Sequence, residues 1–106
     1  MEKIIIPNEL LEPLVTYAIR YCLGRTSYAV GDAQNIVQAT WKYLSSRGRE
    51  VLMRDVHEEI RHNKKRGTPP PEDIQKIWAD ILKYMQAHQN DLQEATSAYP
   101  TIWRNG

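Results

Sequence analysis

The sequence has no phenylalanine, a single cysteine and no long apolar run. One cysteine, Cys22, cannot form an internal disulfide, which excludes the small secreted proteins that disulfides hold together. The N-terminal stretch Ile4-Ile5-Ile6 is too short for a secretory signal, and no segment approaches the roughly 18 apolar residues that a membrane span needs. We therefore expect a cytoplasmic protein with no membrane contact.

A dominant charge is also missing, because 14 lysines and arginines face 13 aspartates and glutamates, for a net charge of +1. That balance gives no overall field that would attract nucleic acid or an anionic membrane, so any electrostatic site must be local. A hydrophobic content of 42% with 25% charged residues is ordinary for a folded protein. At this length a single core is expected, and we predict one domain over residues 1–106.

Helical periodicity begins close to the N-terminus. The pattern predicts a first helix over residues 8–23, with Asn8 as its N-cap and Gly24 as a left-handed stop. Cys22 lies on the apolar stripe of this helix, which favours a buried small hydrophobe over a reactive thiol. We expect its inward-facing residues to be Leu11, Leu14, Val15, Ala18 and Cys22.

Two further helices follow, each opened by a hydroxyl side chain that can cap it. Thr26 or Ser27 caps the second helix, and Ser45 or Ser46 caps the third. We expect the inward-facing residues to be Val30, Ala33, Ile36, Val37, Thr40, Trp41 and Leu44 in the second helix, and Leu52, Met53, Val56 and Ile60 in the third.

The strongest break in the pattern is the segment 61–71, in which a basic run is followed by Gly67 and three successive prolines. We interpret it as the linker between the third and fourth helices. Glu72 opens the fourth helix, which either continues past Asn90 toward Ser97 or breaks near Asn90. Its apolar stripe comprises Ile74, Ile77, Trp78, Ile81, Leu82 and Met85.

The fold class that these elements predict is all-α, a small bundle of four or five helices. We find no internal repeat and no convincing strand. The run Ile4-Ile5-Ile6 is the exception, because it could form a short extended segment at the N-terminus that pairs with another strand.

No motif in the sequence reaches the specificity of a catalytic or metal site. His57 and His62 stand five residues apart, whereas the zinc-peptidase motif needs four for both imidazoles to share one helix face. Glu59 and His62 match the spacing of a di-iron site but have no second pair. The ridge Asp55, Glu58, Glu59 and His62 is more typical of a solvated helix face. We therefore expect no enzyme, no metal and no cofactor, with a metal-assisted enzyme as a remote alternative.

The best electrostatic candidate is the basic surface within residues 47–66. Its cations could track a phosphate backbone, bind a protein, or simply end a helix in solvent. Near-zero net charge and four acids on the same helix weigh against nucleic acid. The residues concerned are Arg47, Arg49, Arg61, Lys64, Lys65 and Arg66.

The C-terminal segment 98–106 is a second candidate, because large apolar side chains stand in an otherwise polar tail. Tryptophan and tyrosine tolerate a partly wet environment and often anchor interfaces. Tyr99 and Trp103 could therefore dock onto the core, onto a protein partner, or onto a second copy in a homodimer.

Part of the chain also resembles a known group of proteins. Residues 17–30, YAIRYCLGRTSYAV, together with Arg54-Asp55-Val56, are similar to small phage and prophage proteins of uncharacterised function. Those proteins have a tyrosine-rich first helix, a Leu-Gly-Arg turn, a Tyr-Ala-Val entry to the second helix and an Arg-Asp pair in a serine-capped helix. The resemblance covers about half of the chain and does not extend to the proline-rich linker or the C-terminal part.

The resemblance implies a context, since small phage accessory proteins commonly bind and inhibit or redirect a host macromolecule, including defence nucleases. Arg25 can bind exposed backbone carbonyls or pair with Asp55 across the bundle, or Arg25, Arg54 and Tyr28 can form a recognition site. We therefore expect a phage-type accessory protein in the bacterial cytoplasm that inhibits or modulates a host protein complex. A nucleic-acid-binding regulator is the alternative.

Overall fold

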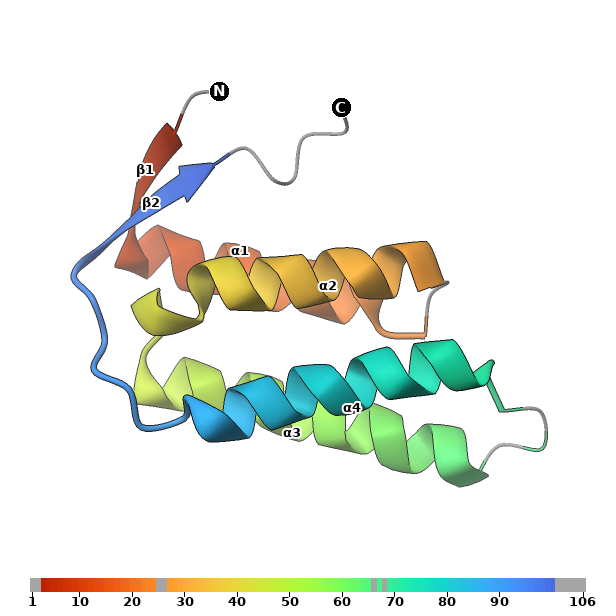
Figure 1. Cartoon of the computed structure of the whole chain (residues 1–106). Coiled ribbons are helices and arrows are strands. Elements are labelled where there is room, and N and C mark those ends of the chain that lie inside the picture. The colour runs from red at the N-terminus through yellow and green to blue at the C-terminus, as the bar shows by residue number, and fades with distance from the viewer. Residues whose placement is uncertain (1–2, 25–26, 66, 68, 101–106) are drawn as a thin grey trace.

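The helices of the described part run alternately in opposite directions and form two layers (Figure 1). The computed structural model describes residues 3–24, 27–65, 67 and 69–100, without the side chains of 3–4, 27–28 and 97–100. Within these residues lie four α-helices, a 3-10 turn and two short strands. The elements are β1 (Lys3–Pro7), α1 (Asn8–Cys22), α2 (Ser27–Thr40), η1 (Trp41–Tyr43), α3 (Ser46–Lys65), α4 (Glu72–Ala87) and β2 (Thr96–Pro100).

Each helix packs on two neighbours: α1 on α2 and α3, and α4 on α2 and α3. The pair α1–α2 forms one layer, and the pair α3–α4 forms the other (Figure 1). This arrangement confirms the all-α bundle that the periodicity predicts. The extended N-terminal run also exists, as β1.

A single apolar core lies between the two layers. Nearly all residues that the periodicity turns inward are buried or pack against it, including Cys22, a buried free cysteine. Leu14 is the correction: it is 45% exposed, because it lies on the outer side of α1. The fully buried large side chains include Leu11 and Ile19 of α1, Trp41 of η1, Leu52 of α3, and Trp78, Ile81 and Met85 of α4.

Side chains of α3 hold the C-terminal end of α1. Gly24 has a φ of 73°, so it provides the left-handed stop that the sequence predicts. Its backbone N–H donates to Glu59 Oε2 at 3.0 Å. One turn earlier, Arg20 Nε donates to Asp55 Oδ2 at 2.9 Å. The partner of Asp55 is therefore Arg20, whereas Arg25 lies outside the described residues.

Ser45 caps the N-terminal end of α3, as the sequence predicts, and a side chain from α1 holds it in place. Ser45 Oγ accepts a hydrogen bond from Gly48 N–H at 3.0 Å and donates to Glu12 Oε1 at 2.6 Å. The carboxylate also places a negative charge at a helix N-terminus, where it is favourable. A Cβ on Gly48 would lie 1.5 Å from Glu12 Oε1, so glycine is what allows this approach.

Two predicted boundaries need correction. The basic residues 61–65 do not belong to the linker, because α3 continues to Lys65, where cations suit the helix C-terminus. At the other end, α4 stops at Ala87 and does not run toward Ser97. Of the two alternatives, the break near Asn90 is therefore correct.

Beyond α4, the chain returns along the end of the bundle and forms a two-stranded antiparallel ribbon. β2 pairs with β1 in a register that sets Tyr99 opposite Ile4 and Ser97 opposite Ile6. Part of the predicted tail, residues 98–100, therefore docks onto the N-terminal segment by its backbone. Trp103 lies outside the described residues.

Candidate protein-binding surface

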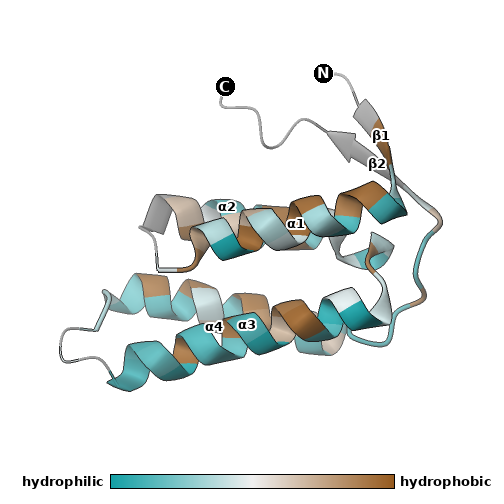
Figure 2. Cartoon of the chain, turned by 180° about the vertical axis from the view of Figure 1, so that it is seen from behind, coloured by the Kyte–Doolittle hydropathy of each residue, from teal (hydrophilic) through white to brown (hydrophobic). Residues whose placement is uncertain are grey.

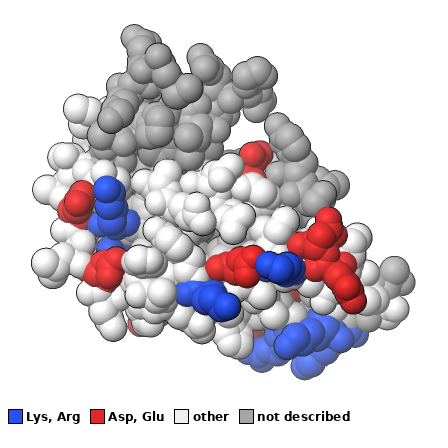
Figure 3. Space-filling model, viewed as in Figure 1, with Lys and Arg blue, Asp and Glu red and all other residues white. Residues whose placement is uncertain are grey.

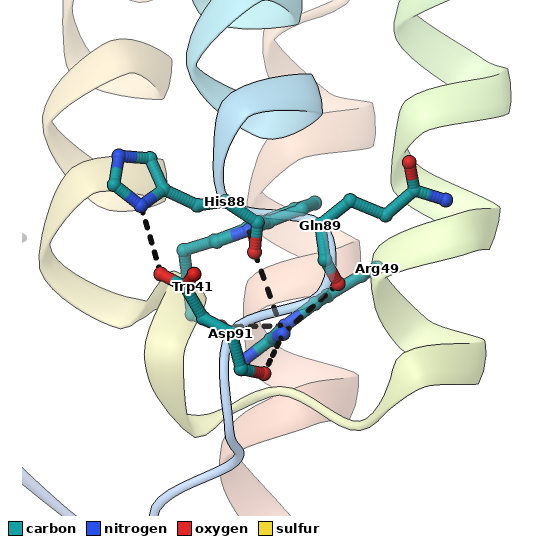
Figure 4. A network of polar contacts seen from close by, with 5 residues as sticks. All are labelled: Trp41, Arg49, His88, Gln89 and Asp91. Carbon is teal, nitrogen blue, oxygen red and sulfur yellow. Dashed lines mark hydrogen bonds and ion pairs between the residues drawn. The ribbon is translucent and has the colours of Figure 1, made fainter.

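Arg49 is not part of a basic surface, contrary to the sequence-based prediction. It is 1% exposed and lies between the start of α3 and the turn that follows α4 (Figure 4). Its position one turn into α3, on the same face as the buried Leu52, turns it inward. The sequence pattern does not predict the burial of Arg49, since an arginine among charged neighbours is ordinarily solvated.

Backbone carbonyls, rather than acids, surround the Arg49 guanidinium. Nε donates to the carbonyl of Trp41 at 3.1 Å. Nη1 donates to the carbonyls of His88 at 3.5 Å and Gln89 at 3.1 Å, and to that of Asp91. These carbonyls lie in η1 and just after the C-terminal end of α4, where a cation is favourable. Those of Gln89 and Asp91 accept from Arg49, while those of Trp41 and His88 also accept from Leu44 N–H and Trp41 Nε1.

Further hydrogen bonds hold residues 88–94 in place beside η1. Trp41 Nε1 donates to the carbonyl of His88 at 3.0 Å, and Glu94 N–H donates to the carbonyl of Lys42 at 2.8 Å. Asn8 Nδ2 also donates to the carbonyl of Glu94. Arg49 is therefore a structural residue that fixes the path from α4 to β2.

The remaining cations of the predicted basic surface do not form one patch. Arg47 lies in the first turn of α3 and Lys64 in the last, about 26 Å apart along the axis at 1.5 Å per residue. Arg47 pairs with Glu50 at 3.3 Å, and Arg61 pairs with Glu58 at 2.8 Å. Lys64 and Lys65 are exposed at the helix end, and Arg66 lies outside the described residues.

The acidic ridge of α3 is partly used by the fold. Asp55 and Glu59 bind Arg20 and the backbone of Gly24, and Glu58 pairs with Arg61. In the part of the chain that the structure describes, no group of three or more His, Cys, Asp and Glu side chains could hold a metal ion. The geometry gives no support to the metal-assisted alternative.

The outer face of α1 is the feature that the sequence reading missed. Four large side chains are exposed along it: Leu10 at 58%, Leu14 at 45%, Tyr17 at 73% and Tyr21 at 57%. Their spacing of four, three and four residues keeps them on one side of a helix. We call these four residues the α1 stripe.

A signal for the α1 stripe was present in the sequence. Residues 8–22 are apolar on two faces of one helix, and a surface helix needs only one apolar face to join a core. The stripe through Leu11 and Val15 is buried in the bundle, whereas the side chains of the second stripe are 45% or more exposed. Periodicity cannot decide which of two stripes faces the core.

An open groove adjoins the stripe, between α1 and the start of α3. Its volume is about 720 Å³, and Tyr17 belongs both to the groove and to the stripe. Pro13 and Val51 provide apolar wall, while Arg47 and Glu9 lie among the polar lining. The stripe and the groove therefore adjoin at Tyr17, and the charged side chains of Glu9, Glu12, Arg20 and Arg47 line the groove beside it.

The layer beside the stripe carries little charge on the α2 side, whereas Glu9 and Arg20 lie on the groove side. α2, the neighbour of α1 in the same layer, has Asp32 as its one charged residue. On the face drawn in Figure 3, charged side chains gather over α3 and α4, and the surface over α2 is nearly free of them. Figure 2, from behind, likewise shows a browner ribbon in α1 than in α3. An exposed apolar stripe in such surroundings is typical of a protein-binding surface.

Comparison with models of protein families, with curated proteins and with solved structures finds no match to this chain. None of the helices in the described ranges is both long enough and apolar enough to cross a membrane.

Proposed function

We propose that this chain acts by binding another protein, with the α1 stripe and the adjoining groove as its docking surface. The observation that carries the proposal is the row of four large side chains, each 45% or more exposed, on a helix whose other face is in the core. A monomer has no structural use for a second apolar face, and tyrosine and leucine side chains in a row are suited to anchoring a partner helix.

The wider context that supports this proposal is the resemblance to small phage accessory proteins. Two of the three tyrosines of the matching segment, Tyr17 and Tyr21, are half of the exposed stripe. The proposed partner is therefore a host protein complex in the bacterial cytoplasm, which the chain inhibits or redirects. Arg25, Tyr99 and Trp103 remain candidate partner-binding residues on the basis of the sequence alone.

Site-specific photo-crosslinking in bacterial cells tests the docking surface. A photoreactive phenylalanine analogue placed at Tyr17 should give one discrete adduct, because the partner covers that position. The matched control is the same analogue at Lys83, an exposed residue of α4, which should give none. Absence of any discrete adduct from position 17, or equal adducts from both positions, would contradict the proposal.

Nucleic-acid binding through α3 is the competing function. Among the described cations of the predicted basic surface, Lys64 and Lys65 favour it, because they are exposed. Those two exposed cations would neutralise about two phosphates, which predicts a slope of about −2 for the logarithm of affinity against the logarithm of salt concentration. Binding this weak falls within ordinary nonspecific association. A steeper slope that Lys64→Glu with Lys65→Glu removes would favour the nucleic-acid function over the protein-binding one.

A further inference from the structure

We infer that, when no other partner is bound, a second copy of this chain covers the α1 stripe in an antiparallel pair of α1 helices. The inference rests on the proposed function only in taking the stripe as a docking surface. It adds a regulation of that surface: self-association masks it, and a partner must displace the second copy.

The order of side chains along the stripe favours a two-fold, antiparallel pairing. The spacing of four, three and four residues reads the same in both directions. A two-fold axis between Leu14 and Tyr17 therefore sets Leu14 opposite the Tyr17 of the second copy, and Leu10 opposite its Tyr21. Each aromatic ring then meets a leucine, and the same patch serves both copies, as a closed dimer requires.

Charges on the flank of the stripe complement each other in that arrangement. Glu9 and Arg20 are eleven residues apart, which is three turns plus about 20°, so they lie on the same flank. In the antiparallel pair, Glu9 comes level with Arg20 of the second copy to within about 3 Å along the axis. Glu9 is exposed, and the Arg20 side chain is 55% exposed although its Nε binds Asp55.

The size of the contact indicates a weak, exchangeable dimer. Four side chains in each copy, at roughly 100 to 200 Å² apiece, bury on the order of 1,000 Å² in total, the lower limit for a specific interface. Such an area is typical of transient complexes, with dissociation constants on the order of 1 to 100 µM. A partner that fills the groove as well as the stripe therefore has more surface to bind and can displace the second copy.

Sedimentation velocity over a concentration series tests the association itself. The chain should shift from monomer to dimer as its concentration rises through the micromolar range. Leu14→Glu should weaken the dimer at least tenfold, because it buries a charge opposite Tyr17. The matched control is Leu92→Glu: Leu92 is 91% exposed and lies outside the stripe, so the dimer should persist. A thermal melt checks that both variants fold.

Cysteine crosslinking tests the antiparallel register. Leu10→Cys in one copy and Tyr21→Cys in another lie opposite each other, so a mixture of the two variants should form a mixed disulfide. Leu10→Cys alone should not, because the two copies of residue 10 are about 16 Å apart along the axis, beyond the roughly 7 Å that a disulfide spans. Efficient crosslinking of Leu10→Cys with itself would overturn the antiparallel arrangement. The unchanged chain, whose Cys22 is buried, is the background control.

The two proposals fail in different ways. A purified chain that stays monomeric to millimolar concentration overturns self-association. Adducts of position 17 with a different protein in cells would still support the α1 stripe as a docking surface. A dimer that Leu14→Glu does not affect also overturns the inference, since it would use another surface. A stripe-dependent dimer in vitro with no adduct to any other protein in cells would support self-association and contradict the proposed host partner.

Discussion

The two layers of the bundle differ in how they use charge. α1 and α2 carry four charged residues, Glu9, Glu12, Arg20 and Asp32, whereas half of the twenty residues of α3 are charged. Both layers bury an apolar face in the same core. The difference therefore lies on the outside, where α3 is solvated by its own ion pairs and α1 exposes leucines and tyrosines.

This contrast shows that a charged side chain is not always exposed and that an apolar side chain is not always buried. In the described part of the chain, the most charged helix contains the buried cation Arg49, and the less charged layer contains the exposed α1 stripe. A binding surface is better sought among exposed apolar side chains than among dense charges, because a charged side chain in contact with water needs no partner.

The largest expected effect comes from removing the buried charge of α3. Arg49→Met should lower the free energy of unfolding by about 4 kcal/mol, because four hydrogen bonds from a buried charged group to backbone carbonyls are lost, at about 1 kcal/mol or more each. Arg47→Met, in the same helix turn but exposed and paired with Glu50, should change it by less than about 0.5 kcal/mol. Urea denaturation of both variants measures the difference. Equal losses would show that the two arginines are not distinguished by burial.

A second prediction separates the two apolar faces of α1. Leu11→Ala should lower the free energy of unfolding by about 3 kcal/mol, since Leu11 is fully buried. The adjacent Leu10→Ala should cost less than about 0.5 kcal/mol at concentrations where the chain is monomeric. The order of the two effects should reverse in the sedimentation assay, where Leu10→Ala should weaken the dimer more than Leu11→Ala does. If Leu10→Ala proves as destabilising as Leu11→Ala, the stripe is not free surface.

The smallest effect probes the contact between the layers. Gly48→Ala should lower the free energy of unfolding by about 1 kcal/mol, because the new methyl displaces Glu12 from Ser45. In a Glu12→Ala background the same change should instead raise it by up to about 1 kcal/mol, since alanine favours a helix. Gly31→Ala is the control: nothing lies within 4 Å of its added Cβ, so it should stabilise in both backgrounds. Additive effects of Glu12→Ala and Gly48→Ala in thermal or urea unfolding would contradict this capping contact.

Much of the fold could be predicted because helix stops and periodicity are local. The predicted cap Asn8 is wrong, because Pro7 is the N-cap of α1 and Asn8 binds the carbonyl of Glu94. The stripe of α4, the left-handed Gly24 and the burial of Cys22 all follow from residues within one helix and its ends. The candidate site could not be predicted in the same way. Its basic surface was inferred from sequence proximity, which does not distinguish Arg49 from Arg47 two residues earlier.

The sequence by itself determined the helices, their approximate ends and the existence of one core, because these depend on interactions between neighbouring residues. Only the tertiary structure decided which of the two apolar stripes of α1 faces the core, that Arg49 turns toward the carbonyls of residues 41 and 88–91, and that the last strand returns to pair with the first. The physical reason is that burial is a property of the space between elements. That space exists only once four helices pack together. Their packing leaves the stripe of Leu10, Leu14, Tyr17 and Tyr21 on the outside.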